Sequence, residues 1–139
     1  MVKDLREIYP IQTLSDERYA IRDLELPTDM NFEDDHISSA LGFTCHLVFM
    51  CSKYLSIPLR YTLICNASRS AVKDDDVIYP LYKTNTERQQ FDKAVLLLER
   101  NIECLLKMRG VQYLPRTHLL AKLDRLFIQI TEGGIFYHK

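Results

Sequence analysis

Residues 59–110 read LRYTLICNASRSAVKDDDVIYPLYKTNTERQQFDKAVLLLERNIECLLKMRG, and this stretch decides the fold. Apolar and polar residues alternate over 59–66, a pattern typical of a half-buried strand. A second short strand is predicted over 69–73, and the acidic loop 74–76 closes the pair. The proline-containing segment 79–82 is predicted to be extended. The first half of this stretch therefore indicates a pair of antiparallel strands.

A long helix is predicted to follow from Thr84. The Thr84 hydroxyl can cap the first turn while Glu87, three residues on, reaches back to form a capping box. Apolar residues then recur with a helical period and define one buried face, made of Phe91, Ala94, Val95, Leu98, Ile102 and Leu105. Gly110 is a natural residue just past the end of a helix. The whole stretch thus indicates a ββα unit.

The residues before position 59 predict the same order of two strands followed by a helix. Residues 5–13 and 19–26 resemble a strand pair joined by the polar turn 14–18. In the second strand the apolar residues change phase, which predicts a bulge near Asp23. These residues therefore supply the strands of a first unit.

The helix of this first unit is predicted to begin at Asp34 or Asp35 and to end before Pro58. One stripe of apolar or small residues follows the helical period: Ile37, Ala40, Leu41, Thr44, Leu47, Val48, Cys51, Tyr54 and Leu55. Apolar side chains also lie outside this stripe, at Phe43, Phe49 and Met50. We therefore expect the helix either to pack on two sides or to lend its second side to a partner.

A third, shorter helix is predicted over 117–130, ended by Gly133-Gly134. Residues 135–137 then form either a last strand or an exposed aromatic tail. The order is ββα, ββα and an incomplete third unit. This order predicts an α+β layered fold, with residues 1–139 as a single domain.

Composition narrows the classes of function. The chain has 139 residues, 47% of them apolar, and a formal net charge of −1, which argues against nucleic acid held by bulk charge. Charge is uneven, since residues 1–35 carry ten acids against four bases and residues 107–139 carry six bases against two acids. Such asymmetry either orients a protein toward an anionic surface or is simply a solvated face.

The cysteines are predicted to be reduced core thiols of an intracellular protein, because they lie in apolar periodic segments without a C-x-x-C pair: Cys45, Cys51, Cys65 and Cys104. The longest run without charge, 37–52, has 16 residues. That is fewer than the about 20 that a membrane-spanning helix needs. No signal peptide is expected, so we expect a protein that is soluble or touches membranes only from outside.

Catalytic motifs are sparse. The histidines form no recognisable ligand set, so neither a metal nor a cofactor is expected: His36, His46, His118 and His138. Cys45 and His46 are helix neighbours that point about 100° apart, so they do not form a nucleophile and base. The run Asp74-Asp75-Asp76 is interpreted as a solvated loop rather than a cation site. We therefore expect no enzyme activity.

Several segments, taken in order, carry a family resemblance: Ala40-Leu41-Gly42-Phe43-Thr44, His46-Leu47-Val48, Pro58-Leu59-Arg60-Tyr61, Ser68-Arg69-Ser70, Tyr79-Pro80-Leu81-Tyr82, Gln90-Phe91-Asp92 and Asn101-Ile102. With Ile8-Tyr9-Pro10-Ile11 at its start, the match covers roughly residues 5–110. In these segments the chain resembles the C-terminal globular domain of the UV-radiation-resistance-associated protein family. The resemblance implies a fold similar to the β-α repeated autophagy-related domain of Beclin, excised from a longer coiled-coil protein.

The resemblance also implies a function. The chain is then a non-catalytic adaptor of the class III phosphatidylinositol 3-kinase complex, with a Beclin-like subunit, the kinase and its regulatory subunit as partners. It is expected in the cytoplasm, peripheral on endosomal and autophagic membranes, where it supports endocytic trafficking and autophagy. The alternative is a module that binds anionic membranes directly through aromatic loops and the basic C-terminal third.

Two sets of candidate residues follow. The family-matching positions are expected to make either local structural or partner contacts: Arg60, Ser68, Arg69, Ser70, Gln90, Phe91 and Asp92. The candidate lipid contacts are aromatic or basic: Tyr79, Tyr82, Lys107, Arg109, Arg116, Lys122, Arg125, Phe136 and Tyr137.

Overall fold

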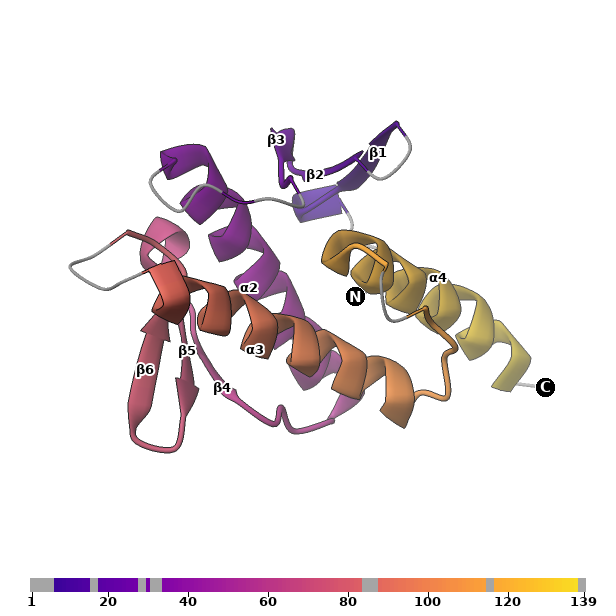
Figure 1. Cartoon of the computed structure of the whole chain (residues 1–139). Helices are drawn as coiled ribbons and strands as arrows, with labels where there is room; N and C mark the ends of the chain where they lie inside the picture. The colour runs from indigo at the N-terminus through magenta and orange to yellow at the C-terminus, as the bar shows by residue number, and fades with distance from the viewer. Residues whose placement is uncertain are drawn as a thin grey trace.

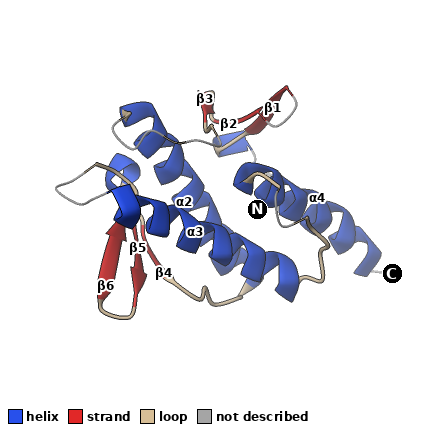
Figure 2. Ribbon diagram, viewed as in Figure 1, coloured by secondary structure: helices blue, strands red, loops and turns tan. Residues whose placement is uncertain are grey.

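Two small antiparallel sheets, each followed by a long helix, form the chain, and a further helix packs against both halves (Figures 1 and 2). The computed structural model describes residues 7–15, 18–27, 30, 34–83, 88–114 and 117–137, with the backbone alone for 131–137. Within these residues the elements are β1 Ile11–Ser15, β2 Arg18–Ile21, β3 Leu24–Glu25, α2 Asp35–Leu55, β4 Thr62–Ile64, the 3₁₀ turn η1 Ala67–Arg69, β5 Ala71–Asp74, β6 Val77–Pro80, α3 Arg88–Met108 and α4 Leu119–Tyr137. The α+β prediction is confirmed.

The first sheet corrects the sequence interpretation of residues 19–26. Arg22 and Asp23 have φ of 49° and 68°, and Ile21 pairs with Leu24, so a two-residue hairpin turn separates β2 from β3. The phase change reflects this turn, and the bulge predicted near Asp23 is wrong. The register irregularity lies instead between Thr13 and Ser15. The first strand begins at Ile11, because residues 7–8 are helical and residues 1–6 fall outside the description.

Helix α2 has the predicted bounds. Asp34 caps it by accepting from the His36 amide at 2.8 Å. It ends where Ser56 adopts φ 56°, with the Ile57 amide bonded to the Ser52 carbonyl, so the helix stops before Pro58 is reached. The backbone geometry of Ser56, rather than the proline, terminates the helix.

The residues of α2 outside its apolar stripe, Phe43, Phe49 and Met50, are half-buried and pack against the core, in line with packing on two sides within the chain. The stripe itself faces the core, and a second stripe of small residues is also buried: Ser38, Gly42, Cys45 and Ser52. At Gly42 a Cβ atom would overlap the carbonyl oxygen of Ala67 and lie 2.7 Å from its carbon. Turn η1 therefore packs directly on the helix backbone, which only glycine permits.

The second sheet has three strands. Residues predicted as the strand 59–66 pair only over β4, and those at 67–69 form η1 rather than a simple polar break. The segment predicted as merely extended, 79–82, begins inside β6, where Tyr79 lies opposite Val72. Ser70 stabilises the η1 turn, since its hydroxyl accepts from the Asn66 amide at 3.0 Å and donates to the Ala67 carbonyl at 2.8 Å. Each unit is thus βββα rather than ββα.

Helix α3 ends as predicted. Gly110 has φ 71°, its amide donates to the Lys107 carbonyl, and the Val111 amide donates to that of Leu106. The side chain of Asn101, fully buried, clamps Tyr61 by accepting from its amide at 3.0 Å and donating to its carbonyl at 2.9 Å. The capping box at Thr84 and Glu87 lies outside the described residues.

Helix α4 is longer than the prediction of 117–130. Its backbone is helical from Leu119 through Gly133 and Gly134 to Tyr137, so 135–137 are not a strand. Each glycine costs a helix about 1 kcal/mol, which weakens the helix without forbidding it. His118 caps its start, because Nδ1 accepts from the Leu120 amide at 3.0 Å while Nε2 donates to the Leu26 carbonyl at 2.7 Å. This histidine ties α4 to the end of the first sheet.

Candidate functional site

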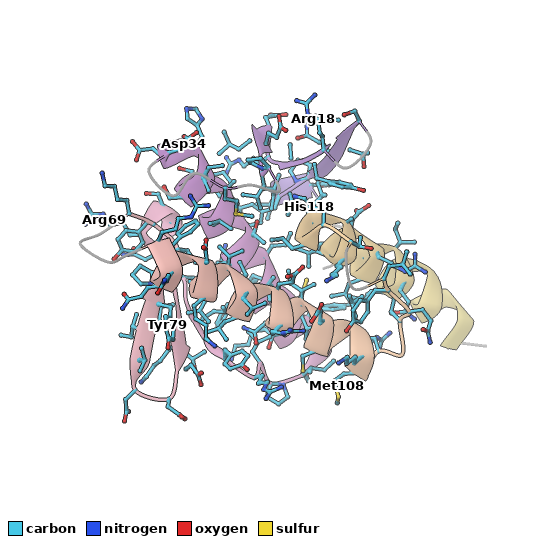
Figure 3. The ribbon with its side chains drawn as sticks, viewed as in Figure 1. Arg18, Asp34, Arg69, Tyr79, Met108 and His118 are labelled. Carbon is cyan, nitrogen blue, oxygen red and sulfur yellow. The ribbon has the colours of Figure 1, made fainter. Side chains whose placement is uncertain are left out.

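The exposed family-matching residues flank strand β4. Arg60 lies over the ring of Tyr61, 5.4 Å from its centroid, and leaves its charge at the surface. Ser68 and Arg69 are exposed on η1, as Figure 3 shows for Arg69, whereas Ser70 is fully buried beneath them. Ser70 therefore has a structural role, and the exposed positions are available to a partner.

Apolar side chains extend this surface over the outer face of the second sheet. Ile64 on β4 is 36% exposed and Ile78 on β6 is 54% exposed. Both alternate with the inward row Leu63, Val72 and Tyr79, which faces the core. We call Arg60, Ile64, Ser68, Arg69 and Ile78 the second-sheet surface.

The segment 90–92 divides between the interior and solvent. Phe91 is 1% exposed and packs in the core, as its place on the apolar stripe predicts. Asp92 pairs with Arg88 one turn earlier at 3.2 Å, and Gln90 is exposed. These residues mainly stabilise the start of α3.

The predicted lipid-binding residues do not form one patch. Tyr79 and Tyr82 are half-buried on and just after β6, while Lys107 is exposed at the opposite end of α3 (Figure 3 labels Tyr79 and Met108). Helix α3 has 21 residues and is therefore about 30 Å long. Arg116 lies outside the described residues, as do the side chains of Phe136 and Tyr137.

Basic and apolar side chains do gather around the connection between α3 and α4. Lys107 and Arg125 are exposed, and Arg109 is half-buried. Beside them lie apolar residues that are exposed to 65% at Met108, 75% at Leu114 and 42% at Ile128. We call Lys107, Met108, Leu114, Arg125 and Ile128 the loop-end surface.

Lys122 corrects the sequence prediction, because it is fully buried and not available to a lipid headgroup. Its Nζ donates to Glu103 at 2.7 Å and to Glu99 at 3.0 Å, which joins α4 to α3. Burial acts to lower the pKa of Lys122, but the hydrogen bonds that it donates to Glu103 and Glu99 outweigh this effect and raise the pKa. For Glu103, burial acts to raise the pKa and is outweighed by Lys122 and Arg100. Lys122 is thus held protonated, unlike a nucleophilic lysine.

A cleft of about 530 Å³ lies beside this cluster. It runs between the β1–β2 hairpin, the α3–α4 connection and α4, and its lining comprises Thr13, Tyr19, Gln112, Tyr113, Leu114, Thr117, Ala121, Lys122, Asp124, Arg125 and Ile128. Sequence reasoning missed this cleft, because it depends on long-range packing such as the rings of Tyr19 and His118, 4.9 Å apart. The charge of Lys122, which lines the cleft, is already compensated by Glu99 and Glu103.

The residues first considered for chemistry have structural partners. His46 is hydrogen-bonded through Nδ1 to the Tyr9 hydroxyl at 2.6 Å, and Cys45 is fully buried. Cys65, contrary to prediction, is exposed rather than a core thiol. Over the described residues, no cluster of histidine, cysteine and carboxylate side chains has the geometry to hold a metal ion. The same part of the chain contains no helix long and apolar enough to span a bilayer.

No family model matches the sequence, but individual relatives do. The chain is 37% identical to mouse UV radiation resistance-associated protein over 122 residues, which is 80% of this chain and 18% of that protein. It is 31% identical to vacuolar protein sorting-associated protein 38 of Schizosaccharomyces pombe over 145 aligned positions, covering 95% of this chain and 30% of the relative. It is 26% identical to the Drosophila melanogaster UV radiation resistance-associated gene protein over 76% of the chain. The chain thus spans less than a third of each relative's length.

Proposed function

The chain belongs to the UV radiation resistance-associated protein family, and we propose that it is a non-catalytic adaptor domain of a class III phosphatidylinositol 3-kinase complex. In this proposal residues 1–139 are a single domain, similar to the β-α repeated domain of Beclin and drawn from the C-terminal part of a longer protein. Its partners are a Beclin-like subunit, the kinase and its regulatory subunit. It works in the cytoplasm, on the surface of endosomal and autophagic membranes.

The observation that carries this proposal is the similarity to vacuolar protein sorting-associated protein 38, which runs along 95% of the chain. A match of that extent includes both βββα units and α4, so it concerns the whole architecture and not a short motif. The relative's name connects it with vacuolar sorting. Protein sorting between membranes is the setting in which the proposed complex acts.

The second-sheet surface is the proposed contact with the Beclin-like subunit. Strand β4 pairs with β5 on one side and is an edge of its sheet. Arginine side chains precede and follow this edge at Arg60 and Arg69, with Ile64 between them. Exposed apolar residues bordered by arginines are common at protein interfaces.

Affinity recovery of the tagged chain from cells, with blotting for Beclin and the kinase, tests the adaptor role. The double variant Ile64→Glu/Arg69→Glu is expected to reduce Beclin recovery at least about tenfold, the effect of about 1.4 kcal/mol of binding energy. The matched control, Arg125→Glu/Ile128→Glu on the loop-end surface, is expected to recover Beclin normally. Failure of the unmodified chain to recover Beclin contradicts the proposal.

The loop-end surface supports a second candidate, direct binding to anionic membranes. Lys107 and Arg125 lie beside apolar residues that are well exposed, Met108 and Leu114 above all. Each basic residue near an anionic leaflet contributes about 1 kcal/mol to membrane binding. Apolar side chains strengthen binding further by inserting into the membrane interface. Flotation with phosphatidylserine vesicles is expected to be salt-sensitive and weakened by Lys107→Glu/Arg125→Glu. Equal flotation with neutral vesicles contradicts the electrostatic part.

A further inference from the structure

Two cysteines from different elements meet at the surface beside η1. Cys45 lies in the middle of α2, Cys65 directly follows β4, and their Sγ atoms are 3.7 Å apart although 20 residues separate them in sequence. Cys45 is fully buried, whereas Cys65 is exposed. The contact thus joins an exposed residue to a fully buried one.

The surroundings make the two sulfur atoms chemically unequal. A hydrogen bond from the Cys45 thiol lowers the pKa of Cys65, against the effect of its partial burial. The same contact, together with burial, raises the pKa of Cys45. Burial alone raises the pKa of Cys51 to about 12, as expected for an inert core thiol. Cys65 is the better nucleophile of the pair, and Cys45 is the one that keeps its proton.

We propose that Cys65 is a site of reversible oxidation by hydroperoxides and that Cys45 resolves the oxidised sulfur into an intramolecular disulfide. The proposal does not depend on the adaptor function. It rests on the exposure of the residue Cys65, the burial of Cys45 and the short distance between their sulfur atoms. An accessible cysteine with a resolving cysteine beside it is the usual arrangement of a thiol redox sensor.

The chemistry proceeds in two balanced steps. The Cys65 thiolate attacks hydrogen peroxide, a sulfur–oxygen bond forms as the oxygen–oxygen bond breaks, and hydroxide leaves with a sulfenic acid remaining on Cys65. The Cys45 thiol then transfers its proton to the hydroxyl of the sulfenic acid as its sulfur attacks the Cys65 sulfur, so that the sulfur–oxygen bond breaks and water leaves. Peroxide is reduced and the two thiols are oxidised.

Little movement is needed for the second step. A disulfide has an S–S distance of about 2.05 Å, so the sulfur atoms, 3.7 Å apart, must approach by less than about 2 Å. Cys65 is an exposed residue that follows a short edge strand, so we expect it, rather than Cys45 inside α2, to move. The product links α2 to the segment that enters η1.

Peptide mapping of the purified chain after hydrogen peroxide treatment and alkylation of the remaining thiols tests the proposal. We expect a linked pair of peptides containing Cys45 and Cys65, with a mass lower by two hydrogens, and its reversal by dithiothreitol. The Cys104→Ser variant, matched in chemistry but outside the pair, is expected to form the same link. The Cys65→Ser variant is expected to leave Cys45 as a free thiol.

A sulfenic acid probe separates the roles of the two residues. In Cys45→Ala, Cys65 has no resolving thiol, so dimedone labelling of Cys65 is expected to rise at least about fivefold over the unmodified chain. The proposal is overturned if the unmodified chain yields no linked peptides at peroxide levels that oxidise free cysteine. It is also overturned if Cys65 is labelled equally in the two chains. The linked-peptide readout uses the unmodified chain, so it holds even if a variant folds poorly.

Discussion

Helices α2 and α3 are both 21 residues long and both follow a three-stranded antiparallel sheet, yet their second faces are satisfied differently. Helix α2 lets the backbone of η1 approach through small residues, with Gly42 at the closest point. Helix α3 presents Glu99 and Glu103 to the buried Lys122 of α4. The second face of α2 is therefore covered through close packing, and that of α3 through buried ion pairs.

This difference means that α2 is covered by η1, a turn of the second unit, whereas α3 is covered by α4. Close packing of backbone on backbone involves no charged groups and is insensitive to pH or salt. A buried cation between two carboxylates is stable only when every charge has its partner. We therefore expect substitutions at the two contacts to differ in how much they lower the free energy of unfolding. We also expect them to differ in whether a second substitution restores stability and in whether the loss depends on pH.

The largest effect is expected at the charged contact. Lys122→Ala leaves Glu103 buried without its main partner and is expected to lower the free energy of unfolding by about 3–5 kcal/mol. Urea unfolding followed by circular dichroism measures this change. The exposed Lys107→Ala serves as the control and is expected to lie within about 0.5 kcal/mol of the unmodified chain.

A rescue variant sharpens that result. Lys122→Met combined with Glu103→Leu replaces the buried charges by apolar side chains and is expected to recover most of the lost stability. Equal unfolding midpoints for Lys122→Ala and Lys107→Ala contradict the role of charge in completing the second unit.

The next largest effect is expected where α2 meets η1. Gly42→Ala forces the carbonyl of Ala67 away from the helix and is expected to lower the free energy of unfolding by about 3 kcal/mol. The substitution does so even though alanine favours a helix by about 1 kcal/mol over glycine. Thermal unfolding measures the loss, and Ser39→Ala on the same helix is the control. A stabilised Gly42→Ala chain means that η1 does not lie against α2.

A smaller effect is expected at Asn101, which connects α3 to its own sheet. Asn101→Ala leaves the amide and carbonyl of Tyr61 without their side-chain partner and is expected to cost about 2 kcal/mol. Hydrogen exchange at the Tyr61 amide measures the local change directly. The exposed Gln90→Ala on the same helix is not expected to alter that exchange; if it does, the effect is not local to the clamp.

The smallest effect is expected to be a dependence of folding stability on pH that comes from His118. Burial lowers the pKa of His118 in the folded chain, partly opposed by its bond to Leu26 and by Glu99. Because the unfolded chain takes up this proton first, stability is unaffected well above pH 6.5 and decreases as pH falls from 6.5 through the folded pKa. His118→Asn, which can still cap α4, is expected to remove this decrease in unfolding experiments from pH 8 to pH 5. An unchanged slope in the variant contradicts the assignment to His118.

Glu103 gives a second decrease in a separate pH range. Its folded pKa is lowered, so the stability it contributes is present above 4.5 and is lost as pH falls through the folded pKa. This decrease is expected to persist in His118→Asn and to disappear in the Lys122→Met/Glu103→Leu chain.

Local sequence patterns predicted the two long helices well. The features that these patterns missed depend on packing between distant parts of the chain. The caps at Asp34 and Gly110 depend on one turn of chain, so sequence identifies them. The turn at Arg22 and Asp23 has positive φ at both residues without glycine or asparagine, and its type is therefore hidden in the sequence. The glycine pair in α4 suggested an end because glycine is a poor helix former, yet the backbone continues as a helix through both glycines.

Lys122 and the cleft beside it show the same difference between what a local pattern predicts and what depends on long-range packing. Lys122 occurs three residues after Leu119 and four before Leu126, so its place on the buried face was readable from the helical period. The helical period could not identify its carboxylate partners, Glu103 and Glu99, which lie 19 and 23 residues earlier in the chain. The cleft beside it combines the first hairpin with the last helix, which no local pattern brings together.

The bond between His118 and Leu26 spans 92 residues and has a consequence for how the chain is made. Because His118 follows Leu26 by 92 residues, the Leu26 carbonyl stays hydrated in a growing chain until His118 has been made and α4 docks. Closing so long a loop is slow relative to forming either βββα unit. We therefore expect the contact between His118 and Leu26 to form after the contacts within each βββα unit, so that docking of α4 on the first sheet is a late step of folding.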